Sequence, residues 1–159
     1  MGPHERNYHV FYYLLAAIRA GDSKLSKYDL QSDDPLSFRI LGEGPFDIQD
    51  FNGDVIDEAE HFDQLYSALQ RSGFAEDEIE NITDVIMAIL YLGNVVIEGD
   101  EKAVIQTNDE LIKAAELLKV DAMALERSIL KKTVKYPGQM IEVDLSCDDA
   151  KSARESLIK

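Results

Sequence analysis

The sequence contains very little cysteine. Among its 159 residues only Cys147 carries a thiol, so the chain cannot form an intramolecular disulfide. Nothing in its first residues resembles an export signal. Together these absences indicate a reducing compartment, and we expect the protein to be cytoplasmic.

Basic residues are also scarce. Lys and Arg total 16 against 31 Asp and Glu, which gives a formal net charge of -15 and a pI near 4.4. Nucleic acids and anionic membranes both require a basic footprint, so neither is expected as a partner. The longest apolar stretch, residues 85–97, includes Gly93 and is shorter than the roughly 20 residues that cross a bilayer. We expect it in the core.

The common motifs of catalysis and cofactor binding are missing. The sequence has no GxxxxGK[ST] loop, no GxGxxG and no GxSxG. Its histidines, His4, His9 and His61, are not spaced as HExxH, and Cys147 has no histidine nearby to activate it. The sequence therefore predicts no catalytic residue, no cofactor site and no metal site, and His61 is expected to make a surface contact.

An acidic segment around Asp50 weakly suggests a calcium loop. If Gly53 took the sixth position of such a loop, its first and twelfth positions would be Ile48 and Ala59, neither of which has a carboxylate. Both essential ligands are absent, so a solvated acidic loop is expected.

The pattern of apolar residues is mainly helical. With 45% hydrophobic and 30% charged residues, the composition is that of an ordinary soluble protein, and we expect a single domain over residues 1–159. Residues 25–57 are punctuated by proline and glycine and predict turns and loop. Helical spacing recurs in six other segments: residues 8–19, 58–71, 76–92, 108–118, 121–130 and 146–159.

Local signals support these helices. Asn108, Asp121 and Ser146 are expected as N-caps, and Gly73 as a stop signal. The methionines Met87 and Met123 fall on apolar helical faces and are expected in the core.

Two short strand-like runs, residues 133–135 and 140–143, flank a Pro-Gly turn and predict a β-hairpin. Residues 95–97 are expected to be extended, residues 99–102 to form a solvent loop, and Val104 and Ile105 to return to the core. The fold class predicted from the residues is mainly α with one short β-hairpin.

Several segments resemble the myosin head. Residues 5–15, ERNYHVFYYLL, are similar to the family's GERNYHIFYQLL, with His4 in place of its glycine. Residues 86–94, IMAILYLGN, resemble "ilaaiLhLGN", and residues 153–159, ARESLIK, resemble "aRDALaK". Intermediate positions agree in order and spacing, so the resemblance covers the whole chain.

The resemblance implies a helical part of the upper 50-kDa subdomain, beside the actin cleft of an actin-based, ATP-driven motor. The family's phosphate-binding loop and both of its switches lie outside the matched region. ATP and magnesium are therefore expected in the parent motor and no cofactor in this chain. The implied partners are the actin filament and the remainder of the head.

Two stretches resemble family regions that meet actin. Residues 133–144 correspond to a hairpin, from which Lys135, Tyr136 and Gln139 are candidate actin contacts. Residues 98–102 correspond to a loop, from which the candidates are Asp100, Glu101 and Lys102.

Gln139 falls at a position of regulation in the family, where many members have Thr, Glu, Asp or Ser. A glutamine there resembles the divergent, class XIV-like myosins of apicomplexan parasites and argues against phosphorylation control.

The alternative hypothesis is a free-standing, acidic helical protein-interaction module. The apolar phase of the last helix continues through Leu157 and Ile158, which predicts an apolar patch and possible self-association.

Overall fold

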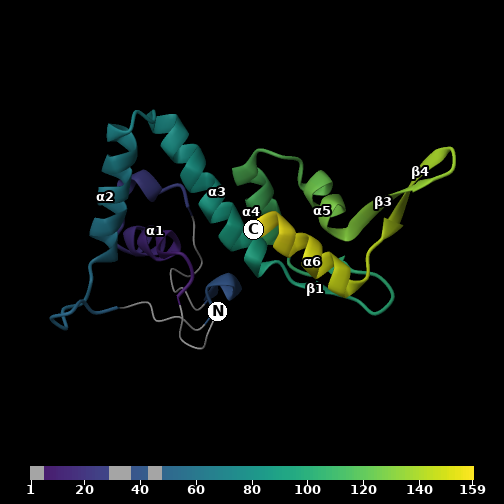
Figure 1. The fold of residues 1–159 in the computed structure, drawn as a ribbon, viewed down its shortest axis with the longest axis horizontal. Coiled ribbons are helices and arrows are strands. Elements are labelled where there is room, and N and C mark those ends of the chain that lie inside the picture. The colour runs from purple at the N-terminus through teal and green to yellow at the C-terminus, as the bar shows by residue number, and fades with distance from the viewer. Residues whose placement is uncertain (1–5, 29–36, 43–47) are drawn as a thin grey trace. The chain divides into compact units, whose positions relative to one another are not determined.

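The protein was analysed as a computed structural model, which describes residues 6–28, 37–42 and 48–159. Over these residues it contains six α-helices, short 3-10 helices and two two-stranded antiparallel sheets (Figure 1). The prediction of a mainly helical fold with a hairpin is confirmed. Two compact units emerge from the internal contacts, Met1–Ile82 and Thr83–Lys159, and each is described by itself. The prediction of a single domain over residues 1–159 stays a prediction.

The first unit is built on two helices that pack against each other, α1 (His9–Arg19) and α2 (Glu58–Arg71). Two 3-10 helices, η1 (Ser23–Leu25) and η3 (Arg39–Leu41), contribute further buried residues. Burial of each large apolar side chain stabilises the unit by about 1.5–3 kcal/mol. The buried apolar residues on these elements are Phe11, Tyr12, Leu14, Leu15, Ala17, Leu25, Leu41 and Phe62.

Helix α2 has a local signal at each end, of which the stop signal at Gly73 was expected. Asp57 precedes the helix, and its carboxylate accepts hydrogen bonds from the backbone N–H groups of Ala59 and Glu60. Gly73 follows the helix with φ of 94°, a left-handed conformation that suits glycine. His61 makes the expected surface contact, because its ring stacks on Tyr13 with centroids 5.2 Å apart.

A buried ion pair joins the segment before α1 to the first residue of α2. Arg6 donates two hydrogen bonds to the Glu58 carboxylate, at 2.6 and 2.7 Å, and the two side chains are only 8% and 4% exposed. The same guanidinium lies over the Tyr12 ring, 3.7 Å from its centroid. Two segments that are 52 positions apart in the sequence are thereby connected.

The acidic loop around Asp50 is a tight turn. The Asp50 carboxylate accepts hydrogen bonds from the N–H groups of Asn52 and Asp54, and Gln49 pairs with Val55. Hydrogen bonds from the Asp54 and Asn52 backbones lower the pKa of Asp50. The part of the chain that the structure describes contains no group of three His, Cys, Asp or Glu residues that could hold a metal ion. His4 and the prolines at 35 and 45 lie outside the described residues.

Helix α3 (Glu76–Asn94) begins in the first unit and ends in the second, which also contains α4 (Asn108–Leu118), α5 (Ala122–Leu130) and α6 (Cys147–Ile158). Within residues 48–159 and the other described ranges, no helix is both long and apolar enough to span a membrane. The core of the second unit is formed by Met87, Ala88, Leu90, Tyr91, Leu92, Val95, Ile97, Ala103, Ile105, Leu111, Ala114, Ala115, Leu125, Ile129, Leu145 and Ala150.

Three predictions within this unit are corrected. Met123 was expected in the core but is 77% exposed. It lies in the first turn of α5, on the face opposite the buried Leu125 and Ile129. Val104 is 42% exposed, since it alternates with buried Ile105 in a strand. The N-cap of α4 is Thr107 rather than Asn108, and its hydroxyl accepts a hydrogen bond from the backbone N–H of Val96.

The second unit contains both small sheets. Strands β1 (Ile97–Glu98) and β2 (Val104–Ile105) form one antiparallel pair, an addition to the single hairpin predicted. Strands β3 (Lys131–Tyr136) and β4 (Gln139–Asp144) form the predicted hairpin, with more residues in each strand than the pattern indicated. Asp121 and Ser146 cap α5 and α6 as expected.

We expect Glu58→Ala to destabilise the protein by about 3–5 kcal/mol, because it leaves the buried Arg6 guanidinium without its carboxylate. The measurement is urea unfolding followed by circular dichroism. Glu60→Ala is the matched control, since this neighbouring carboxylate is exposed and its loss should cost less than about 0.5 kcal/mol. Equal effects of the two substitutions would contradict a structural role for the ion pair.

Candidate functional site

The hairpin begins directly after a helix. Leu130 is the last residue of α5 and Lys131 the first of β3, so no linker separates the two elements. The strands join through the two residues Pro137 and Gly138, and Gly138 has a φ of 91°. Proline sets the first turn position and glycine tolerates the left-handed second, which explains why this dipeptide forms a tight turn.

The structure brings two of the hairpin's predicted site residues together and separates the third. Tyr136 pairs with Gln139 across the turn, so both lie on one face at the tip. Lys135 pairs with Met140, and because successive residues of a strand point to opposite faces, Lys135 lies on the other face. All three predicted residues are exposed.

Ion pairs line the Lys135 face of the hairpin. Arg127 on α5 pairs with Glu142 on β4, and Lys131 pairs with Asp144 across the strands at 3.6 Å. The first of these pairs ties the hairpin to the helix that precedes it. Sequence reasoning missed both pairs, because no local pattern shows that Arg127 reaches a residue 15 positions later.

The second predicted stretch is the turn between β1 and β2. Asp100, Glu101 and Lys102 are all exposed there, as expected. Gly99 has a φ of 132°, and the backbone carbonyl of Lys102 approaches so closely that a side chain at position 99 would not fit. Glycine is therefore required at the start of this turn.

Backbone hydrogen bonds connect both turns to the same short segment, which begins at Leu145. Leu145 follows β4; its N–H donates to the carbonyl of Leu130 at 2.9 Å, and its carbonyl accepts from the N–H of Ala103 at 3.1 Å. Cys147 lies two residues later, with its sulfur 3.4 Å from the carbonyl oxygen of Ile97. The two exposed turns thus have a common base, although their tips come from different parts of the chain.

Comparison with known proteins identifies the family. The myosin head (motor domain) family matches residues 2–159. The chain belongs to the myosin head family. It is 32% identical over 161 residues to unconventional myosin-Ib of Rattus norvegicus and 30% identical over 158 residues to unconventional myosin ID of Drosophila melanogaster, with 98% and 99% of the chain covered. It is also 33% identical over 162 residues to chitin synthase 8 of Mycosarcoma maydis, with 98% covered.

The chain spans only a small part of these relatives: 14% of the rat myosin, 15% of the fly myosin and 8% of the chitin synthase. The resemblance seen in the sequence is confirmed for the family.

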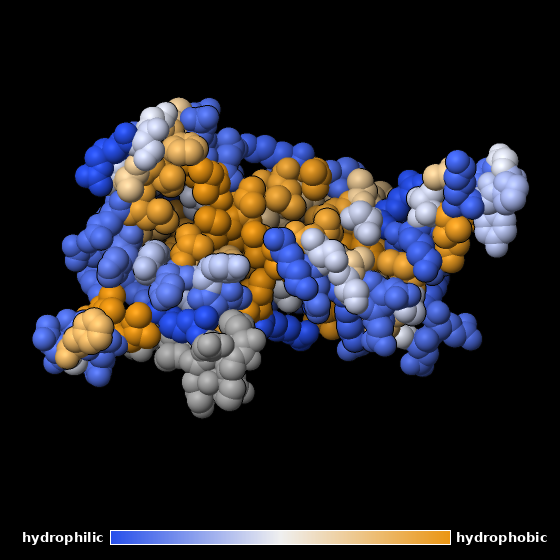
Figure 2. Space-filling model, in the orientation of Figure 1, coloured by the Kyte–Doolittle hydropathy of each residue, from blue (hydrophilic) through white to orange (hydrophobic). Residues whose placement is uncertain are grey.

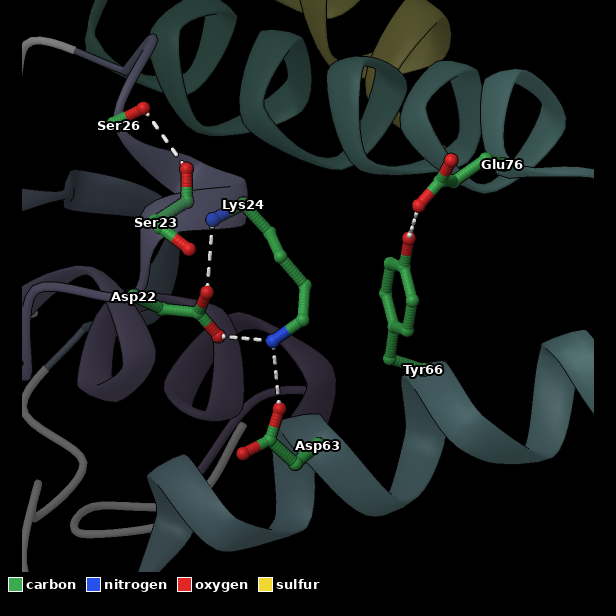
Figure 3. A network of polar contacts seen from close by, with 7 residues as sticks. All are labelled: Asp22, Ser23, Lys24, Ser26, Asp63, Tyr66 and Glu76. Carbon is green, nitrogen blue, oxygen red and sulfur yellow. Dashed lines mark hydrogen bonds and ion pairs between the residues drawn. The ribbon is translucent and has the colours of Figure 1, made fainter.

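This myosin chain also contains a polar network in its first unit (Figure 3). The Lys24 ammonium donates to Asp22 at 2.8 Å and to Asp63 on α2 at 2.9 Å, and it lies 5.4 Å from the centre of the Tyr66 ring. The Tyr66 hydroxyl in turn donates to Glu76, the first residue of α3. The network holds η1, α2 and the start of α3 together.

The protonation equilibria follow this geometry. Burial tends to raise the pKa of Asp22, but the hydrogen bonds and charge of Lys24 outweigh it, so the pKa lies below 3.8. Hydrogen bonds to Asp22 and Asp63 raise the pKa of Lys24 above 10.5. Desolvation, and then the Glu76 carboxylate, raise the pKa of Tyr66 above 10.0. Each pKa shift favours the form that makes these contacts, which is the ionised carboxylate of Asp22, the protonated amine of Lys24 and the neutral hydroxyl of Tyr66. The network therefore has a structural role.

We expect Asp22→Asn to lower the free energy of unfolding by less than about 1 kcal/mol near neutral pH, since the ion pair is partly exposed. A carboxyl group whose pKa is lowered by folding stabilises the fold above its ordinary value of 3.8, and that contribution is lost below it. The difference between the variant and the parent, measured by urea unfolding at a series of pH values, should therefore vanish in acid.

Asp54→Asn provides the matched control, because Asp54 is an exposed carboxylate on a turn and its loss should change stability by less than about 0.5 kcal/mol. A destabilisation by Asp22→Asn that stayed constant down to the lowest pH would show that the lost interaction is not the ion pair.

Proposed function

We propose that this chain forms part of the upper 50-kDa subdomain of an actin-based, ATP-driven motor, where it supplies part of the cleft wall and of the actin-binding face. The match of the myosin head family over residues 2–159 supports this proposal most directly. The hairpin and the turn after β1 also form at the positions where the resemblance implies actin contacts.

The proposed contacts are the two exposed turns of the second unit. At the hairpin they involve Tyr136 and Gln139 at the tip and Lys135 beside it, and at the second turn Asp100, Glu101 and Lys102. An exposed tyrosine offers apolar area and a hydroxyl group together, as is common at protein interfaces. The common base at Leu145 holds both turns on one unit, which suits a surface that must meet a filament at more than one point.

In this proposal ATP and magnesium bind elsewhere in the motor. Phosphoryl transfer needs a loop that cradles the phosphates and groups that hold the metal ion, and those family elements lie outside the region that this chain resembles. The chain itself then takes a mechanical role, with the actin filament and the remainder of the head as its partners. Its location would be the cytoplasm, in association with the cytoskeleton.

The myosin class is proposed from one residue. Gln139 occupies the position at which many family members have Thr, Glu, Asp or Ser, and the structure has it exposed beside the turn. Glutamine has neither a negative charge nor a hydroxyl group to phosphorylate. This supports an apicomplexan, class XIV-like motor without phosphorylation control at this point.

In a motor that carries this segment, we expect Gln139→Glu to change the actin-activated ATPase rate several-fold while basal ATP hydrolysis stays the same. The substitution adds a negative charge at a turn that faces the filament, and a charge at an exposed rim acts mainly on association. Steady-state ATPase assays with and without actin filaments provide the measurement.

Gln70→Glu is the matched control, because Gln70 is exposed on α2 in the first unit and should affect neither rate. Should Gln139→Glu alter basal hydrolysis as strongly as the actin-activated rate, the hairpin would not be an actin contact.

A further inference from the structure

The turn before α2 contains the one Asn-Gly dipeptide of the sequence, Asn52–Gly53. Glycine has no side chain to shield its backbone nitrogen, and a Cβ built at Gly53 would meet no atom within 4 Å. The space beside this peptide bond is therefore open. The other four asparagines of the chain are each followed by a larger residue, namely Tyr8, Ile82, Val95 and Asp109.

The turn is also open to solvent. Residues 49–55 are all exposed. At the lower left of Figure 2, the turn before α2 presents hydrophobic and hydrophilic residues side by side at the surface. Water and hydroxide can therefore reach the bond between Asn52 and Gly53.

An accessible Asn-Gly bond can react without an enzyme. The Gly53 nitrogen forms a bond to Cγ of Asn52 while the bond from Cγ to Nδ2 breaks, and ammonia leaves with the proton that the Gly53 nitrogen gives up. The product is a cyclic succinimide. Water then opens the ring, giving aspartate if the new bond at Cγ is cleaved and isoaspartate if the original peptide bond is cleaved. Either product has a carboxylate in place of the amide.

Asp50 restrains both reacting groups. Its carboxylate accepts a hydrogen bond from Nδ2 of Asn52 at 3.2 Å, which directs the amide toward residue 50. Its backbone carbonyl accepts from the N–H of Gly53 at 3.1 Å. The Gly53 nitrogen attacks only after losing its proton, so a hydrogen-bonded N–H and a restrained amide both slow the closure of the ring.

The same carboxylate holds the backbone of the turn. It accepts from the N–H groups of Asn52 at 2.7 Å and Asp54 at 3.0 Å. Hydrogen bonds from the backbone of Asp54, and then of Asn52, lower the pKa of Asp50, so the ionised acceptor is the form present near neutral pH. Opening of the turn breaks these bonds together.

We propose that Asn52 is a site of spontaneous deamidation in this protein and that the hydrogen bonds of Asp50 set the rate. Ring closure takes place when the turn opens locally, because opening frees the Gly53 N–H and the Asn52 amide at the same time. Asn52 reacts before the other asparagines, since only its peptide bond has a glycine on the far side.

The reaction changes the charge of the turn. The amide of Asn52 donates a hydrogen bond to Asp50, whereas a carboxylate at position 52 has no donor to offer. It also places a third negative charge between those of Asp50 and Asp54. Repulsion between like charges then replaces a hydrogen bond, which favours the open turn.

Isoaspartate has a further effect, because it adds one CH2 group to the main chain. The added length disturbs the pairing of Gln49 with Val55 and the bond from the N–H of Ile56 to the carbonyl of Ile48 at 2.9 Å. The segment that leads to Asp57, the N-cap of α2, loses these restraints. Hydrogen exchange of residues 48–56 should therefore be faster in the isoaspartate form than in the fresh protein.

Ageing of the full 159-residue chain tests the proposal. The folded protein is incubated in mildly alkaline buffer, digested with trypsin and analysed by mass spectrometry. The tryptic peptide of residues 40–71 contains Asn52 as its sole asparagine, so a mass gain in this peptide identifies the site. Methylation by an isoaspartyl methyltransferase distinguishes isoaspartate from aspartate.

Asp50→Ala is compared with Asp54→Ala, which removes an exposed carboxylate from the same turn but keeps the hydrogen bonds of Asp50. We expect Asp50→Ala to accelerate deamidation about fivefold, which corresponds to about 1 kcal/mol of net hydrogen-bond free energy. Asp54→Ala should leave the rate unchanged. Unfolding of the parent chain in urea should accelerate the reaction at least as much as Asp50→Ala, and circular dichroism verifies that both variants are folded.

Asn52→Gln should abolish the mass gain in the peptide of residues 40–71, because the longer side chain must close a larger ring. If another asparagine reacts first in the folded chain, or if Asn52 reacts in urea but stays intact in the folded chain, the assignment of this site is wrong. If the folded parent reacts as fast as the chain in urea, or if Asp50→Ala and Asp54→Ala have equal effects, Asp50 does not set the rate.

Discussion

The second unit depends on two backbone hydrogen bonds made by one residue. Leu145 donates to the end of α5 and accepts from the segment that leads into β2, while its side chain is buried. These bonds fix where the hairpin ends, where α6 can start and where the turn after β1 is held. A backbone group that is removed from water must be paired, so the three elements cannot separate without a free-energy cost.

The elements that the sequence predicted well are those specified by local chemistry. Asp121 and Ser146 cap their helices, Gly73 ends α2, and the Pro-Gly dipeptide forms a two-residue turn. Each of these signals acts within about four residues of its own position.

The features that the sequence did not predict depend on tertiary contacts. Met123 has a helical spacing compatible with the core but lies in solvent, and Arg127 reaches Glu142 only because α5 continues directly into β3. The division of the candidate site into two faces was also missed. This division follows from the strand register, in which Lys135 lies opposite Met140. The resemblance indicated which residues are candidate actin contacts, but not on which face of the hairpin each one lies.

The direct junction between α5 and β3 bears on the strength of the proposed binding. Since Lys131 follows Leu130 without a linker and Arg127 forms an ion pair with Glu142 on β4, the hairpin would lose little conformational freedom on binding the proposed partner. The turn at residues 99–102 shares the same base through Leu145. If both turns contact the same filament, as proposed, their shared base would place the second contact at a high effective concentration once the first had formed, so avidity would add to the strength of each contact alone.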